Sequence, residues 1–310
     1  MSDGREIQRP EKIGFLKGEE SLWLFGNCMI KEEDGSILYP DDDGTIWDGL
    51  TGFLPQSIKQ VEGSGNKNEK SGQMPVVNLD PSIEFGIKEL REVAKKMEKN
   101  YESKSIRLAI GWIVACLLSY EIHKKYNCFP ILFIGGKRES GKTTLANWLM
   151  AMAGLADSAG DSIESGSAAG SIRNLAWYCS LPYWLDEYRN NSKVAKLDGF
   201  FRNAYQRHGS SKGTLSERVR SHSINAGILL SGEETPQDNA LLSRCVVIPL
   251  TKNIRKNIEI YKEIENLRAR GVLSRLVTEV IKGKKKLLPF IFDHIDGWKR
   301  KLLDNGVGER

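Results

Sequence analysis

The sequence predicts an α/β protein: a mainly parallel sheet between helices, with a small β-rich module before it and a helical region after it. Three observations predict this class. Between residues 130 and 251, short apolar runs alternate with segments of helical period, which is typical of parallel sheets. The first sixty residues instead contain short apolar stretches separated by turn signals, and residues 252–310 are helical in pattern and basic.

The composition is that of a folded chain with a core. Of the 310 residues, 40% are hydrophobic and 27% are charged, which excludes a largely disordered protein. The five cysteines form no C-x-x-C pair, which excludes a zinc ribbon and favours a reducing compartment. The longest apolar run, Leu108–Leu118, is too short to cross a bilayer and is predicted to be a buried helix. We therefore expect a cytoplasmic protein with no signal peptide and no membrane partner.

Charge is distributed unevenly along the chain. Residues 1–80 carry 8 basic and 15 acidic side chains, whereas the remainder carries 37 basic and 25 acidic ones. Such asymmetry indicates that the later part meets a polyanion, although an ordinary solvated surface can have the same composition.

Residues 1–62 are predicted to form the small β-rich or irregular module. Its apolar stretches, such as Leu22–Phe25 and Ile37–Tyr39, are separated by Asp-Gly pairs, which favour tight turns. Residues 63–75 are rich in Gly, Ser, Asn and Lys and are predicted to be a flexible linker.

Residues 76–129 are predicted to be a helical segment. Apolar side chains recur there with the spacing of one helix face: Ile83, Ile87, Leu90, Ala94, Met97 and Tyr101. The segment Leu108–Tyr120 is apolar nearly all round, so we expect it to be the buried helix of this group. The sheet-containing core is then expected over residues 130–251, and a C-terminal helical region over residues 252–310.

A phosphate-loop sequence, G-x-x-x-x-G-K-[ST], follows the first apolar run of this core. Its glycines allow a tight turn, so that backbone N–H groups converge on phosphate oxygens at a helix N-terminus. Lys142 is expected to reach the β- and γ-phosphates, and the Thr143 hydroxyl is expected to ligate Mg²⁺. The residues expected to bind ATP in this loop are Gly136, Ser140, Gly141, Lys142, Thr143 and Thr144.

A second carboxylate motif ends another apolar run. Leu181–Leu185 is followed by Asp186 and Glu187, 44 residues beyond Lys142. A neighbouring parallel strand ending there would bring both carboxylates to the nucleotide. Asp186 is then expected to hold Mg²⁺ through water, and Glu187 is expected to polarise the attacking water. Asp-Glu is also a common end of an ordinary strand, so the motif gains weight only from the loop upstream.

The order of motifs resembles that of the AAA+ ATPases. The phosphate loop and the Asp-Glu run are followed by a basic, glycine-containing segment, by the run 228–233 (ILLSGE) and by the run 241–245 (LLSRC). Within that family the chain is similar to the superfamily 3 helicases of viruses, phages and plasmids, and to the helicase halves of mobile-element primase–helicase fusions. The resemblance covers about residues 76–260. It implies a P-loop AAA+ core and a homo-oligomeric ring, expected to be hexameric, with Mg·ATP between subunits and DNA in the channel.

The resemblance also implies two further catalytic residues. Ser231 falls at the end of the fourth core strand, where the family keeps a polar sensor of the γ-phosphate. Superfamily 3 members usually have Asn there, and Glu233 is the alternative nearby. Arg244 falls where an arginine finger would reach the ATP of the neighbouring subunit, although a surface arginine before a strand has the same sequence context.

The basic segment before the sensor strand is the candidate nucleic-acid contact. Gly209 and Gly213 favour a tight, exposed turn, which would place Lys212 at the tip of a hairpin. A lysine there suits sequence-independent contact with phosphates, whereas the alternative is a solvated basic loop. The residues expected to contact nucleic acid are Arg207, Lys212, Arg218 and Arg220.

These features favour an ATP-dependent DNA helicase or translocase that acts on single-stranded or forked DNA in phage or mobile-element replication. Two other classes stay open: an ATP-switched DNA-binding initiator or loader without processive unwinding, and a P-loop kinase of a small molecule. Glu187 and the candidate finger argue against the kinase, and the basic segment favours translocation over a switch. Because such helicases are often C-terminal halves of longer polypeptides, a primase or polymerase is the expected partner, on the same polypeptide or in a complex.

Overall fold

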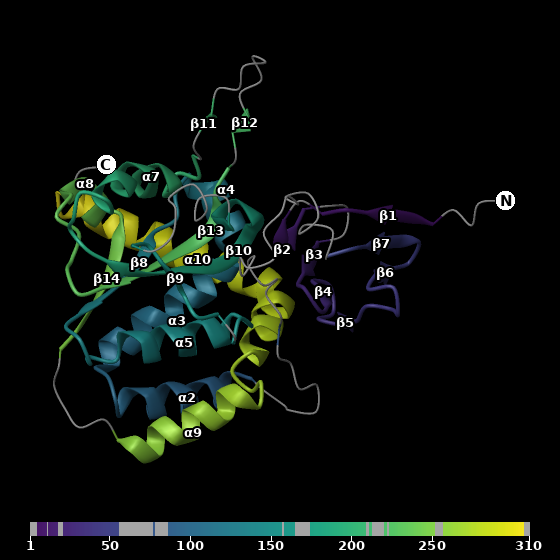
Figure 1. Cartoon of the computed structure of the whole chain (residues 1–310), viewed down its shortest axis with the longest axis horizontal. Helices are drawn as coiled ribbons and strands as arrows, with labels where there is room; N and C mark the ends of the chain where they lie inside the picture. Colours follow the sequence, from purple (N-terminus) through teal and green to yellow (C-terminus); the bar gives the residue numbers. More distant parts are fainter. Residues whose placement is uncertain are drawn as a thin grey trace.

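The computed structural model describes residues 5–10, 12–17, 21–55, 77, 86–156, 158–164, 174–208, 211–212, 220–221, 223–251 and 257–306. It is a mixed α/β structure (Figure 1). Its strands are β1 (Glu6–Gln8), β2 (Ile13–Leu16), β3 (Leu22–Leu24), β4 (Met29–Lys31), β5 (Ile37–Leu38), β6 (Ile46–Asp48), β7 (Thr51–Phe53), β8 (Ile131–Gly136), β9 (Asp161–Ser162), β10 (Tyr178–Tyr188), β11 (Ser211–Lys212), β12 (Arg220–Ser221), β13 (Asn225–Gly232) and β14 (Cys245–Leu250). Its helices are α2 (Ile87–Glu98), α3 (Ser103–Leu117), α4 (Ser119–Tyr126), α5 (Lys142–Met152), α7 (Ala195–Ala204), α8 (Asn239–Leu242), α9 (Ile258–Ala269) and α10 (Arg275–Asp304).

Four neighbouring strands form the parallel part of the main sheet, in the order β14-β8-β13-β10. The predicted apolar runs supply these strands, since β8 begins at Ile131 and β10 contains Leu181–Leu185. The register pairs Ser231 of β13 with Ile134 of β8 and Leu230 with Leu185 of β10. The carboxyl ends of β8, β13 and β10 therefore lie at one edge of the sheet, as a parallel arrangement requires.

The sheet is covered on both faces. Alternate residues of β8 point to opposite faces of the sheet and belong to two hydrophobic clusters. Leu132 and Ile134 pack with α3 and α5, whereas Ile131 and Phe133 pack with α7. Figure 1 shows α3 and α5 below the sheet, with α2 and α9 further out, and α7 and α8 above it. Strands buried from both sides account for the continuous apolar runs of the sequence.

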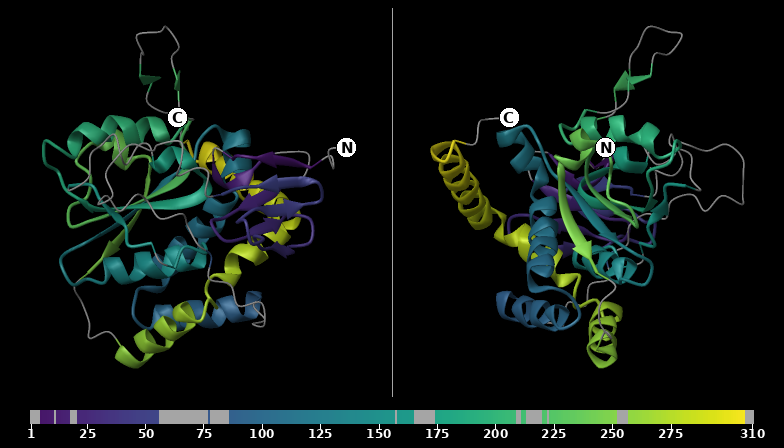
Figure 2. Two further views of the ribbon diagram at one scale, coloured as in Figure 1. Left: turned by 45° about the vertical axis from the view of Figure 1, so that its right-hand side comes forward. Right: turned by 90° about the vertical axis from the view of Figure 1, so that its left-hand side faces the viewer.

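The N-terminal strands extend the main sheet and also enclose a small hydrophobic cluster of their own, formed by Leu22, Leu24, Met29, Ile46 and Phe53. β2 pairs parallel with β10 through Ile13 and Gly14, and β3, β4 and β5 follow as antiparallel strands. Figure 2 shows them beside the core, with β1, β7 and β6 as a small second sheet beyond. The sequence predicts a small β-rich or irregular module over residues 1–62, and the pairing of β2 with β10 joins this segment to a strand more than 150 residues later in the chain. The predicted linker 63–75 lies outside the described residues.

A buried ion pair also joins the N-terminal strands to the core. Nζ of Lys284, on α10, lies 2.8 Å from Oε2 of Glu32 and 3.3 Å from Oε1 of Glu121 on α4. The same ammonium group lies 4.3 Å from the ring centroid of Phe15 on β2. The Lys284 side chain is 7% exposed, so this cluster fixes α10, α4 and the N-terminal strands to one another.

The helical segment before the core is present, with one difference from the predicted stripe. Ile87 is 71% exposed at the start of α2, whereas Val93 and Met97 are buried, and Tyr101 lies beyond the helix end. The apolar segment Leu108–Tyr120, predicted to be one buried helix, is divided between α3 and α4. Ile113 and Cys116 are inaccessible, whereas Leu108 is 41% exposed. In the described part of the chain, no single helix is long and apolar enough to cross a membrane. Helices α3 and α4 pass that test only as a pair, and they are bent by 83°.

Candidate nucleotide site

The loop between β8 and α5, residues 136–143, is a close-fitting turn around glycines. Gly141 has φ +91°, and a Cβ atom there would lie 2.7 Å from the hydroxyl of Tyr101. That hydroxyl donates a hydrogen bond of 2.9 Å to the Gly141 carbonyl oxygen. A Cβ atom on Gly136 would lie 2.5 Å from the Leu250 carbonyl oxygen on β14. The two motif glycines are therefore required by close packing as well as by the turn itself.

Lys142 begins α5 with its ammonium group turned into the loop. Its Nζ donates to the carbonyl oxygens of Gly136 at 2.6 Å and Lys137 at 3.0 Å. Burial lowers the pKa of Lys142, while the charges of Glu233 and Asp186 act in the opposite direction. A partly desolvated cation held only by neutral carbonyl groups can exchange them for an anion.

Ser140 adds a second group suited to an anion. It is 1% exposed, and its Oγ atom has no hydrogen-bond partner among the described atoms. A Cβ atom on Gly136 would lie 2.6 Å from this hydroxyl, so the hydroxyl sits inside the turn of the loop. Buried polar groups are normally paired, and an orphaned hydroxyl within a glycine-rich loop fits a phosphate oxygen.

The Asp-Glu motif lies on β10, two strands from β8 in the sheet. Ser231 Oγ donates a hydrogen bond of 2.5 Å to Oδ1 of Asp186 and accepts one of 2.7 Å from Nε1 of Trp184. Ser231 is fully buried, so these two bonds fix its hydroxyl and orient the Asp186 carboxylate. The structure thus brings Ser231 and Asp186 together and gives Ser231 a positioning contact that the sequence did not predict.

Glu187 lies beside this pair but points to solvent. It is exposed and has φ +63°, a left-handed conformation that is uncommon for a residue other than glycine. Its Oε2 atom accepts a hydrogen bond from Ser162 Oγ on β9, which pairs with the end of β10. Strained backbone of this kind clusters at functional sites, so the conformation supports a role for Glu187 beyond ending a strand.

A cavity of about 330 Å³ adjoins the loop beside α5 and α9. Its walls include Lys142 and Thr143 of the loop and three aromatic residues, Tyr101, Trp148 and Tyr261. The Tyr101 and Trp148 rings meet edge to face, with centroids 5.9 Å apart. The cavity has the size of a small ligand pocket and combines aromatic surface with loop hydroxyl groups, which suits a nucleotide base and sugar.

The residues that could hold a divalent cation are few. In the part of the chain that the structure describes, no three His, Cys, Asp or Glu side chains gather as a metal site. The Thr143 hydroxyl and the Asp186 carboxylate remain as oxygen donors at the loop. Hard oxygen donors of this kind suit Mg²⁺, which keeps several waters and needs few protein ligands when phosphates supply the rest.

Arg244 lies far from the loop of its own chain. It immediately precedes β14, where its carbonyl oxygen accepts from the N–H of Ile131 at the start of β8. The loop follows the other end of β8, about 17 Å away for five residue steps. The guanidinium packs 5.6 Å from the Tyr205 ring centroid, and Nη1 donates to the Ala240 carbonyl oxygen. Arg244 therefore cannot act on a nucleotide bound by its own loop.

The predicted basic hairpin exists, but its tip differs from the prediction. Ser211–Lys212 pairs antiparallel with Arg220–Ser221, and Lys212 is opposite Arg220. Lys212 thus belongs to a strand. Residues 213–219, which include Arg218, lie outside the described residues. A pair of glycines predicts a turn, whereas the register of a hairpin is set by the pairing of both strands. Figure 1 shows β11 and β12 projecting from the body.

Arg207 lies at the base of the hairpin and contacts the core. Its Nη2 atom donates to Ser119 Oγ at 3.1 Å, and its guanidinium lies 5.7 Å from the ring centroid of Tyr120. Burial lowers the pKa of Arg207, which is the mark of a cation inside the protein. This placement favours a structural role for Arg207, at variance with its predicted contact with nucleic acid.

Several residues of the site were missed from the sequence. Tyr101 belongs in the sequence only to a predicted helix stripe, and Ser162 and Tyr261 carry no motif at all. Ser162 and Trp184 reach Glu187 and Ser231 through sheet pairing, and Tyr261 arrives from α9, over a hundred residues after the loop. Only the aromatic residue Trp184, inside the Asp-Glu run, was adjacent to a recognised signal.

No protein family and no curated protein matches this sequence. Among solved structures, the chain is similar to the NrS-1 C-terminal region (305–718), with 15% identity and a TM-score of 0.40 over 62% of this chain and 48% of that one. An A-form apo structure of the same region gives 12% identity and 0.39, over 89% and 65%. An inhibitor-bound JCV helicase gives 18% identity and 0.34, over 70% and 66%. The chain spans about half the length of the first of these structures.

Proposed function

We propose that the chain is an ATP hydrolase that acts as a DNA helicase or translocase. The observation that carries the proposal is the convergence of Lys142, Asp186 with Ser231, and Glu187 at the carboxyl edge of three neighbouring parallel strands. Ligands of open α/β sheets bind at this edge. The two sequence motifs are 44 residues apart, and their meeting at one edge supports one nucleotide site.

Each residue has a task in this proposal. The Lys142 ammonium exchanges the carbonyl oxygens of Gly136 and Lys137 for phosphate oxygens, and the Ser140 hydroxyl supplies a further donor inside the loop. Glu187 orients and polarises the attacking water, with Ser162 holding one of its carboxylate oxygens. Thr143 and Asp186 would hold Mg²⁺ together with the nucleotide, and the bound ion would neutralise phosphate charge.

The position of Arg244 supports the proposal of a ring. Because it lies at the opposite edge of the sheet from its own loop, any contact with ATP must be made to a neighbouring copy of the chain. We propose a homo-oligomeric ring, hexameric by resemblance, with the β11–β12 hairpin directed toward single-stranded or forked DNA. A role in phage or mobile-element replication, beside a primase or polymerase, belongs to the same proposal.

The test compares Lys142→Ala with Lys196→Ala, which removes an exposed lysine on α7 far from the loop. ATP hydrolysis is measured with and without single-stranded DNA, and strand displacement is measured on a forked duplex. We expect the control to retain stimulated hydrolysis and unwinding and Lys142→Ala to lose both. Hydrolysis that DNA stimulates without any strand displacement would favour the initiator or loader, and full activity in Lys142→Ala would overturn the nucleotide site.

A further inference from the structure

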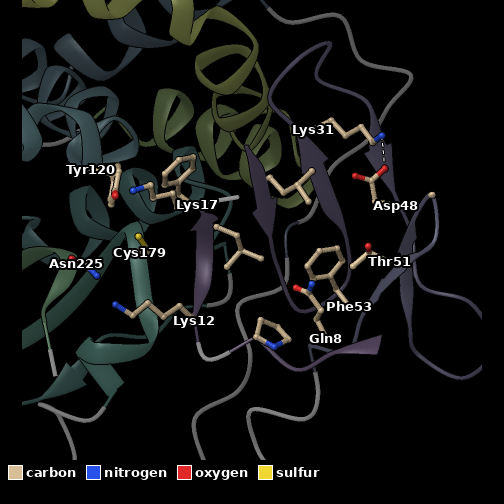
Figure 3. A pocket seen from close by; sticks show the side chains of 15 residues that line it. Gln8, Lys12, Lys17, Lys31, Asp48, Thr51, Phe53, Tyr120, Cys179 and Asn225 are labelled. Carbon is tan, nitrogen blue, oxygen red and sulfur yellow. Dashed lines mark ion pairs between the residues drawn. The ribbon is translucent and has the colours of Figure 1, made fainter. Parts of the chain in front are cut away.

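A groove is lined by both the N-terminal strands and the core, at the amino ends of β10 and β13 and thus at the edge of the sheet opposite the nucleotide loop. It has a volume of about 990 Å³ and is lined along its length by β2, whose flanking residues Lys12 and Lys17 both face it. Its other walls come from β3, β4 and β7 on one side and from Tyr120, Cys179 and Asn225 of the core on the other. We call this cavity the β2 groove (Figure 3).

The β2 groove is positively charged. Lys12, Lys17 and Lys31 line it, against one acidic residue, Asp48. Asp48 forms an ion pair with Lys31, so these two charges offset each other and Lys12 and Lys17 give the groove its net charge. Figure 3 shows both lysines reaching toward the core wall, in the direction of Asn225 and Tyr120.

The two lysines are spaced for an extended polyanion. Lys12 and Lys17 flank a single strand, five residues apart, which corresponds to about 17 Å. A stacked nucleic acid strand carries one phosphate per about 3.4 Å, so roughly five phosphates would span this distance.

The groove is also continuous with the base of the hairpin. Nζ of Lys12 lies 3.3 Å from Oγ of Ser223, two residues beyond β12, and Asn225 of the groove wall begins β13. The register places Cys179 beside both Asn225 and Gly14, so the groove opens at the amino ends of β10 and β13. The hairpin leaves the body at this same edge, before β13.

We propose that the β2 groove binds a segment of single-stranded nucleic acid that continues to the base of the β11–β12 hairpin. Lys12 and Lys17 contact phosphates, and Asn225 and Gln8 offer amide groups to sugars or bases. The half-buried Tyr120 ring, which packs against Phe15 and Arg207, adds aromatic surface to the core wall of the groove. The mixture of cations, amides and an aromatic ring favours nucleic acid over an acidic peptide. This proposal rests on the proposed function.

The test compares two variants that lose the same charge. Lys12→Gln/Lys17→Gln alters the groove, and Lys88→Gln/Lys99→Gln removes two exposed lysines at the ends of α2. Binding of a fluorescein-labelled (dT)20 strand is followed by anisotropy between 50 and 300 mM salt. The slope of log affinity against log salt concentration reports how many phosphates the protein contacts. We expect the groove variant to bind roughly tenfold or more weakly at low salt, with its salt slope reduced by about 1.4, and the control to match the wild type.

Cross-linking of the unaltered protein provides an independent measurement. A (dT)20 strand containing 4-thiothymidine is irradiated in the complex, and cross-linked peptides are identified by mass spectrometry. We expect the cross-linked peptides to include one that contains Tyr120 or Phe53. Unlabelled single strand should reduce this cross-link, whereas poly-glutamate should not. A groove variant that binds poly-glutamate more weakly than the wild type does, while it binds (dT)20 unchanged, would assign the groove to an acidic peptide and overturn the proposal.

The two proposals fail in different ways. If the groove variant binds (dT)20 as tightly as the control, while the wild type shows DNA-stimulated hydrolysis, the groove proposal is overturned and the proposed function stands. If the wild type hydrolyses no ATP, the proposed function fails, while the binding comparison still decides the groove. If the wild type binds no single strand at all, the groove proposal is overturned directly.

Discussion

The Ser231 hydroxyl lies 2.5 Å from Oδ1 of Asp186, on the neighbouring strand, and is held from behind by the Trp184 indole at 2.7 Å. Ser231 is fully buried, so its hydroxyl is a poor candidate for direct contact with a γ-phosphate. Its geometry is that of a residue that orients a carboxylate. In the proposed mechanism, Ser231 therefore acts through Asp186, and the sensor role implied by the resemblance stays a prediction.

We expect Ser231→Ala to weaken the use of Mg²⁺ at the site. Loss of the hydroxyl removes one of two donors to Asp186 Oδ1 and leaves the Glu187 N–H at 2.8 Å. Substitutions of such supporting residues commonly cost roughly 10- to 100-fold in metal affinity or activity. The measurement is ATP hydrolysis as a function of Mg²⁺, where half-saturation should rise. Ser243→Ala is the matched control, because Ser243 is exposed and contacts only its own helix. A change in maximal rate at unchanged Mg²⁺ dependence would contradict the positioning role.

Glu187→Gln should separate binding from chemistry. The amide keeps the shape of the side chain and can still contact Ser162, but it cannot accept a proton from water. We expect hydrolysis to fall by roughly 10²–10⁴ while a fluorescent ATP analogue binds with unchanged affinity. Loss of nucleotide affinity together with turnover would show instead that Glu187 maintains the loop or holds the cation.

Arg244→Ala should lose activity that a second subunit can restore. Its position at the amino edge of β14 predicts that the guanidinium serves a neighbour. Mixing Arg244→Ala with excess Lys142→Ala, whose own Arg244 is intact, should recover part of the ATP hydrolysis. Co-elution of differently tagged variants confirms that the oligomers are mixed. Absence of recovery in such mixed oligomers would remove the role of Arg244 in trans.

Nucleotide affinity should fall at alkaline pH because burial lowers the pKa of Lys142. Bound phosphates favour the ammonium form, so the pKa in the complex is higher than in the free protein. The nucleotide affinity is therefore at its maximum below the pKa that Lys142 has in the nucleotide-free protein. It decreases as pH rises through that pKa, by up to about tenfold per pH unit. Calorimetric titration with an ATP analogue between pH 7 and 10 measures this decrease. Lys142→Arg, which stays charged over this range, should give a flat profile.

Lys284→Met should destabilise the fold. The substitution leaves the carboxylates of Glu32 and Glu121 without the buried cation between them. Breaking such a buried arrangement costs about 3 kcal/mol or more of unfolding free energy. Urea denaturation measures the loss, and Lys285→Met, on the exposed side of α10, is the control. Equal stability of the two variants would show that the cluster contributes nothing net. Because Lys284 is buried, it is also unavailable to nucleic acid.

The local sequence determined the parallel strands and the nucleotide loop. β8 and β14 coincide with predicted apolar runs, and the loop from Gly136 to Thr143 leads directly into α5. The predicted Asp-Gly turns are also present, since Gly35, Gly44 and Gly49 all have left-handed φ values. These features depend on side-chain size, glycine freedom and hydrophobic period, which are properties of a few adjacent residues.

Only the tertiary structure decided which strands and side chains meet. The joining of β2 to β10, the contact of Ser162 with Glu187 and the cavity beside Tyr261 all connect segments far apart in the chain. The position of Lys212 within a strand follows in the same way from its pairing with Arg220. Many residues have an equal propensity to form a strand, and only sheet pairing and burial determine which of them meet. Neighbouring residues in the sequence therefore do not predict these partners.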